Sequence, residues 1–381
     1  MAGSDPLPKV LLVGGEGIPS GVPRHICHLA KAFDGIADVT VISDINHGGY
    51  DALAELGTRH ITLSGLSSRL SLGHMWRGWR GFLAFLRGSR ADLTWIHPRF
   101  PSLMGRMALA LRLWRPKGTT AFTIHGLPYG KGHKPYASFL SLALEKALMR
   151  TCPPTNIIFL SQDMADRARE MIGASRLARH GIHVLPNCSD LGELPPFTRP
   201  KDPTLVMTGR AGRQKNYACA VRLMNHLPEN THLMLCGTGT DTEKFQAEIA
   251  GLVPAATCAR IYCIGPVQDV RPLLRAADAY LLTSRYEGTP IGTLEAFEAG
   301  LPIVLADFEG ADALVDRHPM GIKIDPSDLE TSGKQVTEFL RNARAADRAL
   351  RQQIRTVWHR EWSPDVFDER ARALLHRLLA N

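Results

Sequence analysis

The chain has 381 residues, more than the roughly 250–300 that one hydrophobic core usually supports, so two domains are expected. With 44% hydrophobic and 22% charged residues the composition is that of a globular protein, and no apolar run approaches the roughly 20 residues of a membrane-spanning helix. Seven cysteines without a C-x-x-C pair argue against disulfides or zinc and for reduced thiols. Residues 1–9 do not resemble a signal peptide, so a cytoplasmic protein is expected.

Positive charge is concentrated in one stretch of the first half. The net charge is +8, and residues 69–117 hold ten Lys or Arg against one acid, Asp92. Trp, Phe and Leu alternate with these arginines, a pattern typical of amphipathic helices on anionic membranes. We therefore expect residues 69–117 to contact an anionic membrane surface, with the protein on the inner face of the plasma membrane. A solvated helical face packed on a sheet remains the alternative, and nucleic acid is not expected as a partner.

Short apolar runs alternate with helical stretches along the chain, which predicts parallel α/β layers. Strands are expected at 9–13, 38–43, 93–97, 120–125, 156–161, 183–186, 204–208, 232–236, 261–264, 279–283, 302–306 and 321–324. The Pro-rich residues 187–203 read as a linker between residues 1–186 and residues 204–361. The pattern indicates two Rossmann-like, doubly wound α/β domains facing a central cleft, with ligands at the carboxyl ends of the strands.

The first predicted strand runs directly into a glycine-rich loop. Residues 10–25 read VLLVGGEGIPSGVPRH, in which Gly15, Gly17 and Gly21 form G-x-G-x-x-x-G before a predicted helix. With Asp44 ending the second strand, this pattern could also hold a dinucleotide, as in an NAD-dependent dehydrogenase. By itself the G-x-G-x-x-x-G pattern does not decide between a dinucleotide site and a loop that is only half of a different site.

A second loop, in the second half, carries two cations. The predicted strand at 204–208 ends in Gly209 and Arg210, and Lys215 precedes a helix that should start near Asn216. The amino end of a helix favours anions, so these cations could neutralise a diphosphate without a metal. An ordinary basic surface turn is the alternative.

The stretch from 281 to 304, LLTSRYEGTPIGTLEAFEAGLPIV, carries two carboxylates. A strand ends at Ser284, the following loop holds Glu287, and a helix begins near Ile291 with Glu295 inside it. The backbone N–H groups of residues 289–293 should then be available to a phosphate. Glu295 could accept hydrogen bonds from ribose hydroxyls, and Glu287 could reach a hydroxyl of a sugar.

With these motifs the sequence resembles the retaining glycosyltransferases of family four, the glycosyl transferases group 1, which have the GT-B fold. The family pattern of Glu, seven residues, Glu-Ala and Gly-x-Pro-x-Val matches Glu287, Glu295 and residues 300–304. A second pattern, Gly-Arg with Lys five residues after the Arg, matches residues 209–215. Cys188 stands where the family linker usually has Gly, and residues 288–290 replace the commoner Gly-Phe-Gly.

The resemblance implies a role for each matching residue. His125, Arg210, Lys215 and Glu287 would serve catalysis, with Arg210 and Lys215 on the diphosphate and His125 and Glu287 at the sugar. The implied donor site is Gly21, Gly209, Arg210, Lys215, Gly265, Val267, Glu287, Gly288, Thr289, Pro290, Ile291, Gly292, Thr293, Leu294 and Glu295. A helix at 362–381 would pack back on the first domain, as is typical of this fold.

The implied activity is transfer of a sugar, with retention and without metal or cofactor, from a UDP- or GDP-linked sugar to a glycan or lipid-linked acceptor. Together with the basic stretch it points to assembly of bacterial surface polysaccharide or lipopolysaccharide. A nucleotide-sugar epimerase on the same fold and an NAD-dependent dehydrogenase are the alternatives.

Overall fold

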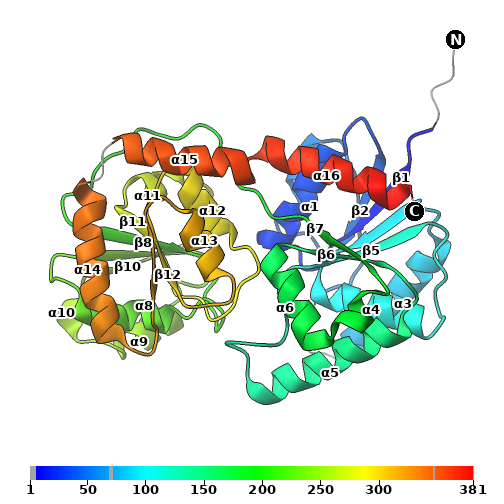
Figure 1. Ribbon diagram of the computed structural model, residues 1–381, viewed down its shortest axis with the longest axis horizontal. Helices are drawn as coiled ribbons and strands as arrows, with labels where there is room; N and C mark the ends of the chain where they lie inside the picture. Colours follow the sequence, from blue (N-terminus) through cyan, green and yellow to red (C-terminus); the bar gives the residue numbers. More distant parts are fainter. Residues whose placement is uncertain (1–5, 68–71, 346–347, 381) are drawn as a thin grey trace, which may run out of the picture. The chain divides into compact units, whose positions relative to one another are not determined.

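The computed structural model describes residues 6–67, 72–345 and 348–380. These residues form two compact units, each an α/β structure built on its own parallel sheet (Figure 1). The first unit consists of the described residues up to Tyr129, together with Lys134–Asn187 and the chain from Pro364 on. The second unit consists of Gly130–His133 and Cys188–Ser363. The residues of the predicted linker, 187–203, are grouped with the second unit except for Asn187, and they form no helix or strand.

The sheet of the first unit has the strand order β3-β2-β1-β4-β5-β6-β7, with every pair parallel. Its central strands are buried on both faces, so they read as continuous apolar runs. The strands are β1 (Lys9–Val13), β2 (Asp38–Ser43), β3 (Arg59–Thr62), β4 (Leu93–Ile96), β5 (Thr119–Ile124), β6 (Asn156–Phe159) and β7 (Gly181–Val184).

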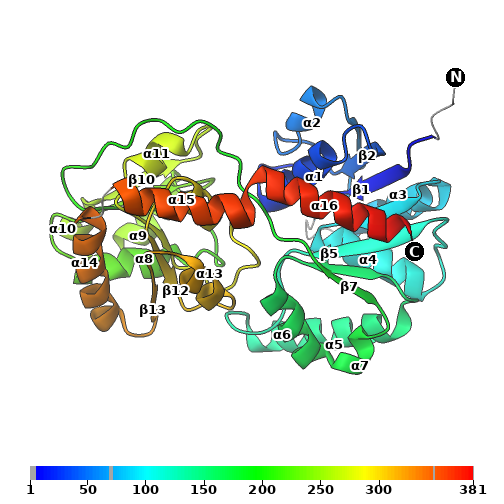
Figure 2. The same cartoon turned by 45° about the horizontal axis from the view of Figure 1, so that its top comes forward.

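Helices cover both faces of this sheet, as Figure 2 shows from a second direction. They are α1 (Gly21–Ala32), α2 (Ala52–Glu55), α3 (Leu72–Gly88), α4 (Arg99–Ala110), α5 (Pro135–Thr151), α6 (Gln162–Ile172), α7 (Ala174–Leu177) and α16 (Pro364–Leu379). Helix α16 packs on α1: Phe367 lies against His25 and His28, and Arg372 Nε donates to Ala32 O at 2.8 Å. The predicted terminal helix therefore begins at Pro364 and belongs to the first unit.

The sheet of the second unit has the strand order β10-β9-β8-β11-β12-β13, again with every pair parallel. Its strands are β8 (Thr204–Thr208), β9 (His232–Cys236), β10 (Ile261–Gly265), β11 (Ala279–Leu282), β12 (Ile303–Ala306) and β13 (Gly321–Ile324). Its helices are α8 (Tyr217–Leu223), the 3₁₀ turn η1 (Met224–His226), α9 (Glu243–Ala250), α10 (Ala255–Cys258), α11 (Arg271–Arg275), α12 (Ile291–Glu298), α13 (Ala311–Arg317), α14 (Leu329–Ala345) and α15 (Arg348–Trp362).

Both sheets have the doubly wound order in which strands run outward from a central pair. In the first sheet the order reverses between β1 and β4, and in the second between β8 and β11. Parallel sheets of this kind hold ligands beyond the carboxyl ends of the strands at such a reversal. The loops after β8 and β11 are those that carry Lys215 and Glu287. The fold therefore brings the two predicted motifs of the second unit to its switch point.

Candidate functional site

Lys215 and Glu287 form a direct ion pair in the second unit. The Lys215 ammonium donates to Glu287 Oε1 at 2.8 Å, and the side chains are only 17% and 8% exposed. The loop after β8 supplies the lysine and the loop after β11 the glutamate, so two neighbouring strands position the pair. A cation and a carboxylate are thus held side by side at the carboxyl edge of the sheet.

Further hydrogen bonds fix the carboxylate of Glu287. Ser284 Oγ donates to Oε1 at 2.7 Å, and Gln214 Nε2 donates to Oε2 at 3.0 Å. The Arg285 N–H donates to Gln214 O at 2.8 Å and ties the two loops together through the backbone. Because three donors hold both of its oxygens, the Glu287 side chain is preorganised in one orientation.

The loop after β8 depends on Gly209 and Asn216. Gly209 has φ +142°, and a Cβ on it would lie 2.4 Å from Lys215 Cε. Asn216, just before α8, has φ +54°, and its side chain accepts from Arg285 Nη2 at 2.7 Å. Glycine at 209 is therefore what lets the lysine side chain fold back across its own loop.

Helix α12 starts at Ile291, as predicted. Gly292 packs closely, since a Cβ there would lie 2.2 Å from Tyr280 Oη and 2.6 Å from Thr208 Oγ1. The expectation that the N–H of Thr293 is available was wrong, because this group donates to Pro290 O at 3.0 Å. The helix turns at once after Pro290, so the exposed amino end is one residue shorter than the sequence suggested.

Two glutamates of α12 are buried. Glu295 is 5% exposed, on the same helix as the orphaned hydroxyl of Thr293, which is buried without a partner in the described part of the chain. Glu298, which the sequence analysis did not single out, is 1% exposed and accepts from Leu191 N at 2.8 Å. Burial raises the pKa of Glu298 to about 7. The burial of Glu298 could not be predicted from its position in a helix, because it depends on how residues after Cys188 fold over α12.

The other residues of the second unit that were predicted to bind the donor lie mainly on loops. Arg210 is exposed, directly after Gly209. Gly265 ends β10, where its N–H donates to Thr240 Oγ1 at 3.0 Å and its carbonyl accepts from Gly237 N at 2.8 Å. Val267 is 39% exposed. Gly288 and Thr289 lie between Glu287 and α12, and Leu294 is buried in the core.

His125 lies in the first unit, directly after β5. Its ring is close to two other histidines that the sequence analysis did not assign to this site, with ring centroids 5.1 Å from His25 and 5.8 Å from His97. Burial lowers the pKa of His25 and His97 far below the ordinary value and that of His125 to about 3. The imidazoles are therefore neutral and can bind hydroxyl groups. His25 Nδ1 pairs with Asn187 Oδ1 at 2.9 Å.

Several ring nitrogens of this histidine cluster have no hydrogen-bond partner. Both nitrogens of His97 and the Nε2 atoms of His25 and His125 are buried and unpaired within the described residues. Buried polar atoms are nearly always satisfied in folded proteins. The cluster is thus a place where a hydroxyl group or water is expected to bind. The histidine that follows a buried strand, as His97 follows β4, was the signal for it in the sequence.

The opening glycine loop is shaped by packing. Gly14 and Gly17 lie against Tyr50 and the backbone of Ile45, with no space for a Cβ, and Gly21 is the first residue of α1. The Asp44 carboxylate accepts from the N–H groups of Ile45 and Ser67, each at 2.8 Å. Asp44 therefore supports its own loop, which agrees with its interpretation as a strand-end residue.

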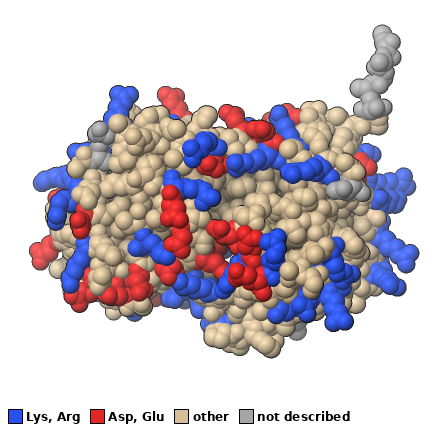
Figure 3. All heavy atoms as spheres, in the orientation of Figure 1, with Lys and Arg blue, Asp and Glu red and all other residues tan. Residues whose placement is uncertain are grey.

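The basic stretch is only partly a surface feature. Arg69 lies outside the described residues, and Arg106 is buried in a bidentate pair with Glu145, at 2.6 and 2.9 Å. Arg106 is therefore not available for the expected membrane contact of residues 69–117. Trp76, on α3, is 61% exposed. Around the first unit, Lys and Arg are more frequent than Asp and Glu on the face drawn in Figure 3.

Within the described residues, no three His, Cys, Asp or Glu side chains are grouped as metal ligands would be. Among the helices described, none has both the length and the hydrophobicity that crossing a bilayer requires.

Two Rossmann-like units with a charged loop site at the switch point define the GT-B class of fold. A solved structure of the same fold is Alr3699/HepE of Anabaena in complex with UDP and glucose, with a TM-score of 0.76 and 14% identity over 97% of this chain and 99% of that one. The family model for glycosyl transferases group 1 matches residues 195–356, and that for glycosyltransferase family 4 matches residues 19–193. The chain belongs to the group 1 glycosyltransferase family.

Curated relatives match the chain over part of its length. A putative glycosyltransferase EpsF of Bacillus subtilis is 27% identical over 37% of this chain and 40% of its own. A UDP-Gal:alpha-D-GlcNAc-diphosphoundecaprenol alpha-1,3-galactosyltransferase of Escherichia coli is 22% identical over 65% of each chain. The chain thus spans less than two thirds of the length of these relatives.

Proposed function

We propose that the protein is a retaining, metal-independent glycosyltransferase that takes a sugar from a UDP- or GDP-linked donor. Arg210 and Lys215 bind the diphosphate, Glu295 binds the ribose, and Glu287 and His125 contact the transferred sugar. The observation that carries the proposal is the Lys215–Glu287 pair at 2.8 Å, beside the amino end of α12. It supplies a cation for phosphate oxygens and a carboxylate for sugar hydroxyls within one fixed arrangement.

In this proposal the bond between the sugar and the diphosphate breaks as the acceptor hydroxyl attacks from the same face. The departing diphosphate takes the proton of the acceptor, so no separate base is needed. Arg210 and Lys215 stabilise the negative charge that develops on the leaving group. Loss of one such contact costs about a hundredfold or more in rate.

The donor site is tested by thermal unfolding with UDP, GDP, ADP, dTDP, CMP and NAD. A ligand at 100 times its dissociation constant stabilises the folded state by about 2.7 kcal/mol, which raises the melting temperature. One nucleoside diphosphate should stabilise the wild type but not Lys215→Ala. Lys244→Ala is the matched control, since Lys244 is an exposed residue of α9 in the same unit. Stabilisation by NAD alone would contradict the proposal and favour a dehydrogenase.

Glu295 is tested with a modified ligand. If its carboxylate accepts from the ribose, the nucleoside diphosphate should bind Glu295→Ala roughly tenfold or more weakly, as expected for lost charge-assisted hydrogen bonds. The 2′,3′-dideoxy form should bind the wild type weakly and be insensitive to the substitution. Equal losses with both ligands would show that Glu295 acts only through stability.

Retention and metal independence need product analysis. The anomeric configuration of the new glycosidic bond, read by NMR, should match that of the donor. Transfer should continue in EDTA. Release of free nucleotide and an isomerised sugar without any acceptor would instead identify an epimerase.

The acceptor is proposed to be a glycan or lipid-linked sugar of a bacterial surface polysaccharide or lipopolysaccharide. The names of the relatives support this, since the Escherichia coli protein acts on a diphosphoundecaprenol-linked sugar. In keeping with that acceptor, we place the protein in the cytoplasm, at the inner face of the plasma membrane.

Membrane contact would use the exposed residues of α3, among them Trp76, Arg77 and Arg80. Arg77→Glu with Arg80→Glu should reduce sedimentation with anionic vesicles, because each basic residue near such a surface contributes about 1 kcal/mol. Arg59→Glu, on the edge strand β3, is the control. Unchanged sedimentation of the double variant would contradict membrane contact through α3.

A further inference from the structure

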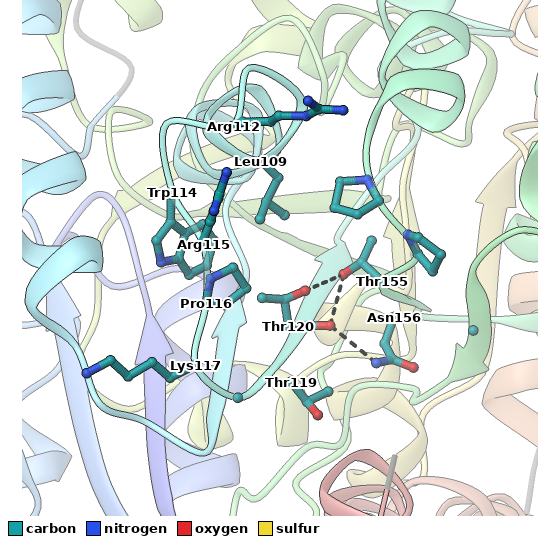
Figure 4. A pocket seen from close by; sticks show the side chains of 14 residues that line it. Leu109, Arg112, Trp114, Arg115, Pro116, Lys117, Thr119, Thr120, Thr155 and Asn156 are labelled. Carbon is teal, nitrogen blue, oxygen red and sulfur yellow. Dashed lines mark hydrogen bonds between the residues drawn. The ribbon is translucent and has the colours of Figure 1, made fainter.

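A pocket of about 830 Å³ lies in the first unit, away from the residues assigned above (Figure 4). It is bounded by Thr119, Asn156 and Gly181, the first residues of β5, β6 and β7. His125, by contrast, follows the last residue of β5. Because the strands are parallel, the pocket lies at the opposite edge of the sheet from the histidine cluster. Its volume is within the range of sites for small organic ligands.

The floor of the pocket is held by hydrogen bonds between neighbouring strands. The hydroxyls of Thr120 and Thr155 lie 2.7 Å apart, and Thr155 Oγ1 lies 2.9 Å from Thr120 O. Asn156 Nδ2 donates to the same carbonyl at 3.3 Å. Figure 4 shows this network below the open space, with the loop of Trp114 and Pro116 on one side. Pro153 and Pro154 also line the pocket. The floor is therefore polar and the walls are rigid.

The lining carries positive charge only. Arg112, Arg115 and Lys117 line the pocket, and none of the described lining residues is acidic. In Figure 4 the guanidinium groups of Arg112 and Arg115 extend toward the upper end of the pocket, whereas Lys117 points away. No ion pair joins either arginine to an acid in the described part of the chain. The two guanidinium groups are thus available to an anion.

The arginines are not needed to neutralise the carboxyl end of α4. Ala108 O already accepts from Leu113 N at 2.8 Å and from Trp114 N at 3.2 Å. Leu109 O accepts from Arg112 N at 3.1 Å. Since other donors serve these carbonyls, compensation of the helix dipole does not explain two further arginines here.

The backbone at Arg112 supports the same conclusion. Its φ is +58°, in the left-handed region that favours glycine. An arginine with this φ has less backbone freedom than a glycine would have. The Arg112 side chain extends along the pocket. Such outliers are tolerated where the side chain has a use.

We propose that this pocket binds a phosphorylated polyol. Arg112 and Arg115 would hold the phosphate, since guanidinium groups match its oxygens in fork geometry. The polyol hydroxyls would lie over Thr119, Thr120 and Thr155, against the proline walls. The ligand is either a soluble polyol phosphate or the glycerophosphate headgroup of a lipid, which share this chemistry. The site is separate from the donor residues and does not depend on the proposed sugar transfer.

The test uses two probes of the full chain. Glycerol 3-phosphate is titrated by calorimetry, and vesicles of phosphatidylglycerol are compared with vesicles of phosphatidylcholine by sedimentation. Arg115→Gln should weaken binding about tenfold or more, the effect of one charge-assisted hydrogen bond. Arg112→Gly removes the second guanidinium while suiting the backbone, and should act in the same direction. Arg59→Gln, an equal change of charge on β3, should have no effect.

Each outcome decides the proposal. Binding of soluble glycerol 3-phosphate that both pocket variants lose supports a soluble ligand. Binding to phosphatidylglycerol vesicles alone, lost in the same variants, supports the lipid headgroup. Binding of neither probe, or losses as large in Arg59→Gln as in Arg115→Gln, would overturn it. Neither probe is a sugar donor, so these results stay distinct from a failure of the proposed transfer.

Discussion

Lys215 and Glu287 are 72 positions apart in sequence, yet the ammonium of one donates to the carboxylate of the other at 2.8 Å. Both charges are largely shielded from water, at 17% and 8% exposure, so each stabilises the other. A ligand that recruits Lys215 has to compete with Glu287. The pair thus links the proposed phosphate contact to the proposed sugar contact.

Glu287→Ala should separate binding from transfer. The variant leaves Lys215 without its carboxylate partner, so UDP or GDP should bind at least as tightly as to the wild type. Sugar transfer should fall about a hundredfold or more. Calorimetry and a coupled transfer assay measure the two effects. Glu248→Ala on the exposed side of α9 is the control, and a large loss of nucleotide affinity in Glu287→Ala would refute this division of roles.

Gly209→Ala should displace Lys215. The new Cβ would lie 2.4 Å from Lys215 Cε, at a residue whose φ is +142°. We expect a loss of about 1–3 kcal/mol in stability and weaker nucleotide binding. Gly212→Ala, in the same loop, has nothing within 4 Å of its Cβ and should change neither. Both are measured by urea unfolding and by nucleotide-induced thermal shifts. Equal behaviour of the two variants would disprove the close packing as the cause.

Glu298 should make stability depend on pH. Its pKa is raised by burial from 4.5 to about 7, so between these values the folded state binds more protons than the unfolded state. The free energy of unfolding should therefore fall as pH rises through this window, by about 1–3 kcal/mol from this group. Glu298→Gln should remove that part of the slope in urea unfolding series from pH 4.5 to 8. Glu338→Gln, exposed on α14, should leave the slope intact.

The buried pair of Arg106 and Glu145 should be costly to break. Two hydrogen bonds of 2.6 and 2.9 Å join the guanidinium to the carboxylate, at 3% and 11% exposure. Arg106→Met leaves an unpaired buried charge and should cost about 3–5 kcal/mol in chemical unfolding. Adding Glu145→Leu should recover much of the loss.

The comparison pair for that experiment is Lys334 and Glu330 on α14. Their contact is 2.8 Å long, within the range of the Arg106 bonds, but both side chains are more than 70% exposed. Lys334→Met should cost less than about 0.5 kcal/mol. If Arg106→Met and Lys334→Met lower the free energy of unfolding by the same amount, burial is not the reason for the large contribution of the Arg106–Glu145 pair.

Much of the fold could be predicted from sequence because parallel strands buried on both faces are continuous apolar runs. The bounds of β1, β2, β8, β9 and β13 agree with the expected ranges. Strand β3 was missed, since it is half exposed and has no such run. The burial of Arg106 within the basic stretch could not be predicted either, because its partner Glu145 lies 39 residues away on another helix.

The candidate site likewise contains residues that could be predicted from the sequence and residues that could not. Lys215, Glu287 and Glu295 follow strand ends or helix starts, where local sequence carries a signal. Of the histidine cluster only His125 was predicted. The unpaired nitrogens of the cluster and the shifted pKa of Glu298 arise only when distant segments pack. Gly209 was predicted as part of the Gly-Arg and Lys motif, whereas its close approach to Lys215 became visible only in the structure.

Helix α16 completes the first unit with residues that a ribosome makes only after the whole second unit. Until then α1 lacks the surface formed by Phe367 and Arg372, and His25 lacks its contact with the Phe367 ring. Domains usually fold in the order of their synthesis. Here synthesis of the first unit begins first, but the first unit is completed only after the second. The side of the first unit that α16 covers therefore stays exposed while the second sheet forms. Translation speed across residues 188–363 therefore sets how long that side needs protection from aggregation.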